Sequence, residues 1–254
     1  MRIKIVIPAR LASTRLPEKL LLKVGGKSIL QHTFESASRA ALADGIVVAV
    51  DHPRLAAEVA SFGGSYLLTS PECQSGTDRV AEVARELKDI DVFINVQGDE
   101  PEIDPNAIDL AIEMLLDNPD ADISTIAKPI RDQKTLADPN CVKVVLDKRQ
   151  YAMLFSRAVV PFARDGMTAD LIMREPPIYL HHVGIYAYRR DFVLWFASQS
   201  PAVTEQVEKL EQLRALEAGR RIVVGRIEQS SVGIDTQEDF EAFRARYEGT
   251  ERSA

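Results

Sequence analysis

Short apolar runs of strand length recur along the first half of the chain. They cover residues 3–7, 46–50, 66–68 and 92–96. Between these runs, apolar residues recur every three or four positions, the spacing of one helix face, over residues 28–42, 53–62, 80–87 and 105–116. This alternation of strand and helix predicts a parallel sheet covered by helices. Ligands bind at the carboxyl ends of strands in such sheets, so we expect the active face in the loops after residues 7, 68 and 96.

The pattern changes near residue 120. Strand-like runs now follow with short connections, over residues 123–130, 142–146, 151–155 and 183–188, and a last one covers residues 222–225. They predict a mixed or antiparallel extension that covers a substrate or pairs with a second subunit. Amphipathic helices are expected over residues 201–218 and 238–247. The first has an apolar stripe made of Val203, Val207, Leu210, Leu213 and Leu216, with Gly219 just beyond its end.

Composition narrows the class of protein. The chain has 254 residues, 46% of them apolar and 27% charged, as in an ordinary soluble globular protein. Its net charge of -7 argues against nucleic-acid binding, which favours a basic surface. No apolar run approaches the roughly 18 residues of a membrane helix, and the strand-like opening leaves no room for a signal peptide. Cys73 and Cys141 match no zinc or redox spacing, so we expect plain thiols in a reducing cytoplasm.

The loop after the first strand, "PARLASTRLPEKL", is rich in cations. It contains Arg10, Arg15 and Lys19, one acidic residue, Glu18, and no glycine. One interpretation is a solvated basic turn, since charged loops are common. The other is a triphosphate site in which Arg10 and Lys19 supply the charge in place of a glycine-rich cradle. The nearby "GGKS" is not a phosphate loop, because that motif needs a glycine where Leu21 stands.

Helix-start signals account for two further motifs. In "GGKS", Ser28 is expected to cap a helix, with Gln31 completing a capping box. In "QSGTDR", residues 74–79, Thr77 is a plausible N-cap. The same segment is also suited to reading the edge of a base, because Gly76 permits a close backbone approach.

Carboxylates at strand ends suggest a metal site. In "NVQGDEP", Asp99 follows a strand, where it serves either a turn or a Mg²⁺ ion that also binds substrate phosphates. In "GIDTQEDF", Asp235 is a second candidate, although either it or Thr236 would cap the helix that follows. In "HHVGIYAY", the adjacent His181 and His182 point to opposite faces of a strand, so at most one faces a site.

Taken in order, these motifs resemble one family. "IPARLASTRLPEKLL", "QSGTDR", "INVQGDEP", "DPNCVKVVLD", "LFSRAVVP", "HHVGIYAYR", "EKLEQLRAL" and "GIDTQEDF" follow the sequence of segments found in 3-deoxy-manno-octulosonate cytidylyltransferases, the CMP-Kdo synthetases. The resemblance runs over about residues 3–247, nearly the whole chain. Because the resemblance is one of motifs, the function that it implies is inferred by analogy.

The resemblance implies a fold and a reaction. The fold would be α/β, a Rossmann-like nucleotidyltransferase (glycosyltransferase-A-like) sandwich with a mostly parallel central sheet and a small mixed or antiparallel extension. The enzyme would transfer CMP from CTP to 3-deoxy-manno-octulosonate (Kdo) and release pyrophosphate, for lipopolysaccharide synthesis. It would be a cytoplasmic homodimer with no nucleic-acid partner and no membrane insertion. A single domain, residues 1–254, would comprise a CTP-binding half over about 1–120, a sugar-binding and dimerisation extension over about 121–235, and a closing helix and tail over 236–254.

The resemblance also implies roles for single residues. Arg10, Lys19 and Asp99 would be catalytic, and Asp99 and Asp235 would hold Mg²⁺. Nucleotide binding would use Pro8, Ala9, Arg10, Lys19, Gln74, Ser75, Gly76, Thr77, Asp78 and Arg79. Sugar binding would use Gln97, Arg157, His182, Tyr186, Glu211 and Gln212.

The chain departs from the family pattern at a few positions. Glu18 and Leu20 stand where the familiar loop reads Gly and Pro, and His181 stands where an arginine is expected. These departures leave the sugar more open than the nucleotide. The alternatives are a cytidylyltransferase for 8-amino-Kdo or sialic acid, and a nucleotide-binding module without turnover. A dinucleotide-dependent oxidoreductase is disfavoured, because no G-x-G-x-x-G follows the first strand.

Overall fold

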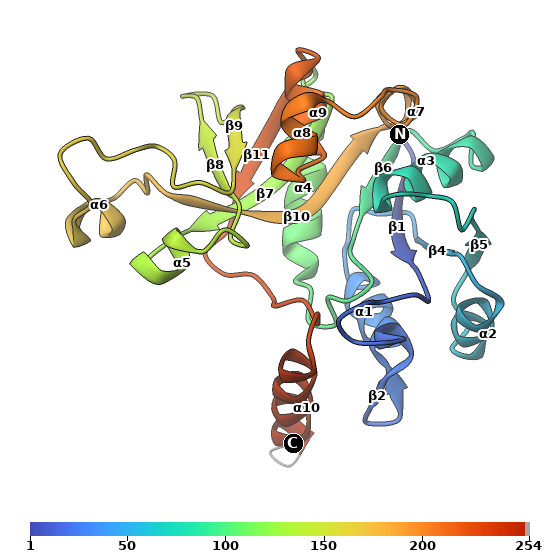
Figure 1. Cartoon of the computed structure of the whole chain (residues 1–254). Helices are drawn as coiled ribbons and strands as arrows, with labels where there is room; N and C mark the ends of the chain where they lie inside the picture. Colours follow the sequence, from blue (N-terminus) through green and yellow to red (C-terminus); the bar gives the residue numbers. More distant parts are fainter. Residues whose placement is uncertain (252–254) are drawn as a thin grey trace. The chain divides into compact units, whose positions relative to one another are not determined.

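The computed structural model of the protein describes residues 1–251 and divides them into two compact units (Figure 1). The first unit comprises residues 1–109, 189–197 and the described residues from Ser231 onward. The second comprises residues 110–188 and 198–230. The functional division expected from the family pattern stays a prediction, and its residues 252–254 lie outside the described chain.

A parallel sheet forms the centre of the first unit. Its strands are β1 (Ile3–Ala9), β4 (Ile46–Val50), β5 (Tyr66–Leu68) and β6 (Val92–Asn95), in the order β6-β1-β4-β5. β1 is buried along most of its length and pairs with β4 up to Ala9 opposite Val50. Because all these strands run the same way, their carboxyl ends meet at one edge, as the apolar pattern predicts.

Helices accompany the sheet of the first unit. They are α1 (Ile29–Ala37), α2 (Pro53–Ser61), α3 (Gly76–Glu86), the start of α4 (Pro105–Asp117), α7 (Arg190–Phe196) and α10 (Gln237–Glu251). A short 3-10 turn, η1 (Lys19–Leu21), and a hairpin of β2 (Lys23–Val24) and β3 (Lys27–Ser28) precede α1. The expected helix over residues 28–42 is too long, since α1 ends at Ala37.

The helix caps correct two details of the sequence analysis. Ser28 Oγ does accept from the backbone N–H of Gln31, at 3.1 Å, but the Gln31 amide donates to Glu35, so the capping box is incomplete. For α3 the cap is Ser75, which forms a full capping box with Asp78, so Thr77 as N-cap was wrong. Ser75, just before the first helical residue, can reach the third helical N–H with its hydroxyl, which a residue inside the first turn does not do.

The second unit has a mixed sheet. Its strands are β7 (Ile123–Pro129), β8 (Lys143–Leu146), β9 (Ala152–Ser156), β10 (Leu180–Arg189) and β11 (Ile222–Arg226). β11 runs parallel to β7, while β10 pairs antiparallel with β7 and β8, and β9 pairs antiparallel with β8. The predicted α/β class with a mixed extension is therefore confirmed. Two short helices, α5 (Gln133–Ala137) and α6 (Ala169–Met173), have too few residues to show a helical apolar period.

The helix expected over residues 201–218 is wrong, because the chain forms two helices there. α8 (Val203–Glu208) ends at Lys209, whose φ of 54° is left-handed, and α9 (Gln212–Glu217) follows. The buried Glu205 carboxylate accepts from the Arg214 guanidinium across this break. Val203 and Val207 are 72% and 78% exposed, so they belong to no core stripe. Among the described residues, no helix has both the length and the apolar content that a membrane span needs.

Candidate functional site

A pocket opens where the parallel strands of the first unit end. Its walls come from the loops after β1, β5 and β6 and from the segment before α10. The lining residues are Pro8, Arg10, Ser13, Lys19, Leu20, Cys73, Gln74, Ser75, Gly76, Arg79, Gln97, Gly98, Asp99 and Asp235. The pocket therefore lies where the alternating pattern places the active face.

Some predicted nucleotide residues do not line this pocket. Ala9 is fully buried in β1, and Thr77 is buried in the first turn of α3. The Asp78 carboxylate accepts from the backbone N–H groups of Gln74 and Ser75, at 3.2 and 3.1 Å. Asp78 thereby shapes the pocket wall without lining it. The binding roles of Ala9, Thr77 and Asp78 stay predictions.

Lys19 forms ion pairs with both candidate metal ligands, Asp99 and Asp235. Its Nζ donates to the Asp99 carboxylate and, at 2.8 Å, to Asp235 Oδ1, and the Arg15 guanidinium lies 2.9 Å from Asp235 Oδ2. Burial lowers the pKa of Lys19, but the charges and hydrogen bonds of Asp99 and Asp235 outweigh it and hold this pKa above its ordinary value. An ammonium ion thus sits between two carboxylates, at a position suited to a cation.

Backbone contacts bring these carboxylates together. The Ile234 N–H donates to the Asp99 carbonyl at 2.8 Å, so the two aspartate segments lie against each other. Asp239 accepts from the N–H groups of Asp235 and Thr236, and the Thr236 hydroxyl caps α10. Asp235 is therefore not needed as a cap, and its carboxylate faces Lys19.

The carboxylates of Asp99 and Asp235 fit a hard cation that also binds oxygen atoms from outside the protein. Across residues 1–251 no group of three or more His, Cys, Asp or Glu side chains is arranged to hold a metal. Two carboxylates converging on one cation position, as Asp99 and Asp235 do around Lys19, match the one or two carboxylates that Mg²⁺ takes beside substrate phosphates.

Glu18 does not pair with the adjacent Lys19. Its carboxylate forms a two-point contact with the Arg54 guanidinium of α2, with Nη2 to Oε2 at 2.8 Å, and this hydrogen bond lowers the pKa of Glu18. Its φ of 50° is left-handed, a conformation that favours glycine. The glycine that the family pattern has at this position therefore suits this backbone conformation. In this chain, Glu18 instead tethers the loop to α2 through Arg54.

His182 in β10 is a buried neutral imidazole in the second unit. Its Nε2 lies 2.9 Å from Thr125 Oγ1, and that hydroxyl lies 2.7 Å from the Ile185 carbonyl, to which it donates. Nε2 must then carry the proton, and Nδ1 is the acceptor. Burial, together with a smaller effect of the neighbouring His181, lowers the pKa of His182 to about 3. Burial also raises the pKa of Tyr186, whose ring lies 5.3 Å from that of His182.

The low pKa values of His181 and His182 predict a loss of stability in mild acid. Burial, with Lys128 and Lys143, lowers the pKa of His181 to about 4, so both histidines bind protons more weakly in the folded chain than at their ordinary value of 6.5. The unfolded chain binds more protons from pH 6.5 downward, so stability falls as pH falls through this range. We expect His182 alone to cost about 2 kcal/mol at pH 5. Urea unfolding of the wild type and His182→Gln at pH 7.5 and 5 tests this, and equal pH dependence in both would contradict it.

The other sugar candidates of the second unit are Arg157, Glu211 and Gln212. The Arg157 guanidinium donates from Nε to the Glu208 carbonyl at 2.6 Å and from Nη1 to the Pro139 carbonyl at 2.9 Å. Gln212 is buried in the first turn of α9, and Glu211 precedes it. Their sugar-binding roles stay predictions, as does that of Gln97, which lines the pocket of the first unit.

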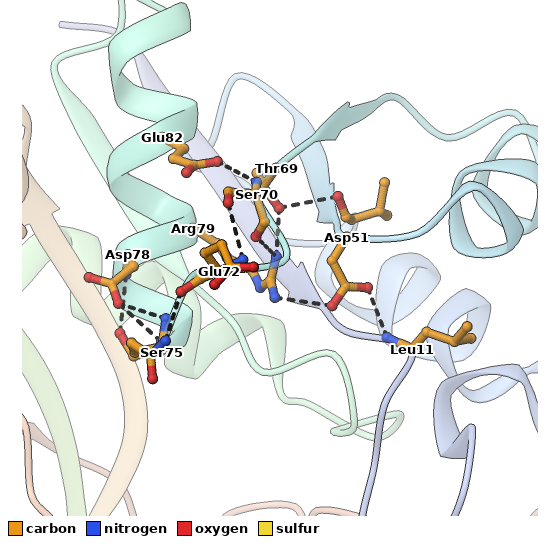
Figure 2. Close-up of polar contacts among 11 residues, drawn as sticks. Leu11, Asp51, Thr69, Ser70, Glu72, Ser75, Asp78, Arg79 and Glu82 are labelled. Atoms are coloured by element: carbon orange, nitrogen blue, oxygen red, sulfur yellow. Dashed lines mark hydrogen bonds and ion pairs between the residues drawn. The ribbon is translucent and has the colours of Figure 1, made fainter.

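Sequence reasoning missed Asp51, which follows β4 directly. Figure 2 shows its carboxylate between the Arg79 guanidinium and the backbone of Leu11. Arg79, expected to contact the nucleotide, is 4% exposed and also donates to Thr69 Oγ1 at 2.8 Å. The available signal was an aspartate immediately after a buried strand, at the same edge as the cationic loop.

Comparison with known proteins gives one consistent result. A family model described as cytidylyltransferase matches residues 4–222. A curated 3-deoxy-manno-octulosonate cytidylyltransferase of Rhodopirellula baltica is 60% identical over 98% of this chain and 99% of its own length, and one of Geobacter sulfurreducens is 45% identical over 95% and 97%.

Solved structures agree with the sequence matches. That of a CMP:2-keto-3-deoxy-manno-octonic acid synthetase complexed with CTP superposes with a TM-score of 0.91 at 38% identity, over 98% of this chain and 100% of the other. A 4-diphosphocytidyl-2C-methyl-D-erythritol synthase from Anaerococcus prevotii, 16% identical over 97% of this chain and 98% of its own with a TM-score of 0.62, shows the shared fold alone.

Proposed function

The chain belongs to the 3-deoxy-manno-octulosonate cytidylyltransferase family, and from this premise we propose that it transfers CMP from CTP to the anomeric hydroxyl of Kdo and releases pyrophosphate. The observation that carries the proposal is the pocket at the strand ends, where Lys19 of the cationic loop meets Asp99 and Asp235. The product would supply lipopolysaccharide synthesis, as the family resemblance implies.

Two segments of the pocket would bind CTP. Arg10 and Lys19 would hold the triphosphate and stabilise the charge that develops at the α-phosphorus, since phosphoryl transfer depends on positioning and electrostatics. Gln74 donates its amide N–H to the Glu72 carbonyl at 2.9 Å, which leaves its side-chain oxygen as an acceptor. That oxygen suits the exocyclic amine of cytosine, which is a hydrogen-bond donor.

Asp99 and Asp235 would hold Mg²⁺. When bound there, the ion would help to bind the phosphates and would lower the pKa of the anomeric hydroxyl. The Lys19 ammonium lies between the same carboxylates in the ligand-free protein, and it would contact the phosphates once those carboxylates hold the cation instead. This exchange keeps the carboxylates neutralised throughout.

Of the residues proposed to bind the sugar acid, Gln97 belongs to the first unit and the others belong to the second. Gln97 lines the pocket of the first unit. In the second unit, the neutral His182 presents Nδ1 as an acceptor for a sugar hydroxyl, and Tyr186 stays protonated as a donor. Glu211, Gln212 and Arg157 complete the proposed set, although the guanidinium of Arg157 already contacts backbone carbonyls.

A panel of sugar acids tests the substrate. The protein would be incubated with CTP, Mg²⁺ and either Kdo, 8-amino-Kdo or sialic acid, and pyrophosphate release followed. We expect the fastest release with Kdo. Release only with 8-amino-Kdo or sialic acid would reassign the sugar, and CTP binding without release from any acid would favour the nucleotide-binding module.

We also infer a homodimer formed by the second unit. Apolar side chains on β9 and nearby loops are exposed, with Met153 at 65% and Phe162 at 84%. Burying such side chains against a second copy would remove apolar area from water. Light scattering that reports the mass of one chain, 28.2 kDa, would contradict this. A cytoplasmic location stays a prediction.

A further inference from the structure

Asp51 forms hydrogen bonds with the backbone on both sides of Arg10. Its own N–H donates to the Ala9 carbonyl at 3.3 Å, and its Oδ1 accepts from the Leu11 N–H at 2.9 Å. The register of the sheet produces this arrangement, because Ala9 at the end of β1 lies opposite Val50 at the end of β4. The residue after each strand therefore falls beside the other, and Arg10 is held between two contacts to one aspartate.

The second oxygen of Asp51 binds Arg79. Arg79 Nη2 lies 3.1 Å from Asp51 Oδ2, and both side chains are nearly buried, at 5% and 12% exposure (Figure 2). Arg79 Nη1 also donates to Thr69 Oγ1 at 2.8 Å and to the Ser70 carbonyl at 3.0 Å. Arg79 thus fixes Asp51 to the loop after β5 and to α3.

Both segments held by Asp51 line the same pocket. Arg10 comes from the loop after β1, and Ser75 and Gly76 come from the start of α3, on which Arg79 also lies. The loop after β1 contains no glycine nest that would shape itself around phosphate, so its geometry depends on contacts from outside. A buried carboxylate with two charge-assisted or backbone donors is a rigid anchor of this kind.

We propose that Asp51 is a positioning residue, which sets the backbone of Arg10 for the triphosphate and couples that loop to the base-binding segment through Arg79. The proposal rests on the proposed function in that it takes CTP to be the ligand. It predicts that Asp51 matters for the phosphates of the ligand more than for its nucleoside, because α3 keeps its own capping box of Ser75 and Asp78.

The test compares CTP with cytidine in titrations of purified variants. Asp51→Ala removes both side-chain contacts, whereas Asp51→Asn keeps an oxygen for the Leu11 N–H and loses the charge opposite Arg79. Asp44→Ala is the matched control, because the Asp44 carboxylate accepts from the Ile3 N–H at 2.7 Å at the opposite end of β1, away from the pocket.

We expect Asp51→Ala to weaken CTP binding at least about tenfold and cytidine binding less than about twofold, the scale of a lost hydrogen bond to a charged group. Asp51→Asn should fall between Asp51→Ala and the wild type, and Asp44→Ala should match the wild type. Unchanged CTP affinity in Asp51→Ala, or an equal loss for CTP and cytidine, would overturn the positioning role. Wild-type affinity in Asp51→Asn would overturn the coupling through Arg79.

A wild-type measurement covers the case in which Asp51→Ala does not fold. Hydrogen exchange of the ligand-free protein should show the Leu11 amide protected at least about tenfold by its bond to Asp51. Exchange at the rate of an open loop would overturn the proposal. If the wild type itself bound no CTP, the proposed function would fail, which is a different outcome from wild type and Asp51→Ala binding CTP equally.

Discussion

Lys19→Ala is expected to lower turnover at least about 100-fold, the scale of losing one oriented charge at a transition state. In the ligand-free protein the Lys19 ammonium is 13% exposed, is held by Asp99 and Asp235, and lines the pocket at the strand ends. The measurement is steady-state pyrophosphate release with saturating CTP and Kdo.

A matched control is available for this substitution. Lys27→Ala also removes one lysine of the first unit, which pairs with Glu35 at 2.6 Å outside the pocket. We expect Lys27→Ala to keep wild-type turnover. Lys19→Ala with turnover close to that of Lys27→Ala would reject the role of Lys19.

Asp99→Asn should lower turnover by at least about 100-fold and raise the Mg²⁺ concentration needed for half-maximal rate. Asparagine keeps the size of the side chain, and the backbone contact from Ile234 to the carbonyl of residue 99 is unaffected. The substitution therefore removes one charge from the cation position formed with Asp235. Rates would be measured over a Mg²⁺ titration after exhaustive chelation.

The control for this variant is Glu102→Gln. Glu102 pairs with Arg246 in the same unit and does not line the pocket, so its variant should show the wild-type Mg²⁺ profile. Activity that survives chelation, or the same Mg²⁺ profile in Asp99→Asn and the wild type, would contradict the metal assignment.

The strands and the pocket were predictable because the local sequence pattern shows which residues are buried and where each strand ends. β4 and β5 match the apolar runs 46–50 and 66–68, and Arg10, Lys19 and Asp99 lie in the loops that follow strand ends. The break at Lys209 was not predictable, since no glycine or proline marks it and the left-handed turn is held by Glu205 and Arg214 across the break.

Asp51 shows why part of the site escaped the sequence. Its role depends on Leu11 and Arg79, which lie 40 and 28 residues away along the chain. A single aspartate after a strand is interpreted as a turn residue until the register of β1 and β4 is known. Arg79 was expected to contact the nucleotide, which stays a prediction, and its pairing with Asp51 was missed because sequence shows a charge without showing its partner.

The pairing of Lys19 and Arg15 with Asp99 and Asp235 has a consequence for what enters the site. These four side chains are electroneutral together. A free divalent ion would leave an excess positive charge there, and free CTP, with about four negative charges at neutral pH, would leave a larger negative one. A metal–nucleotide complex, with about two negative charges, leaves about half the excess that free CTP leaves. The charge balance of the ligand-free site therefore favours the metal–nucleotide complex over free CTP as the species that enters.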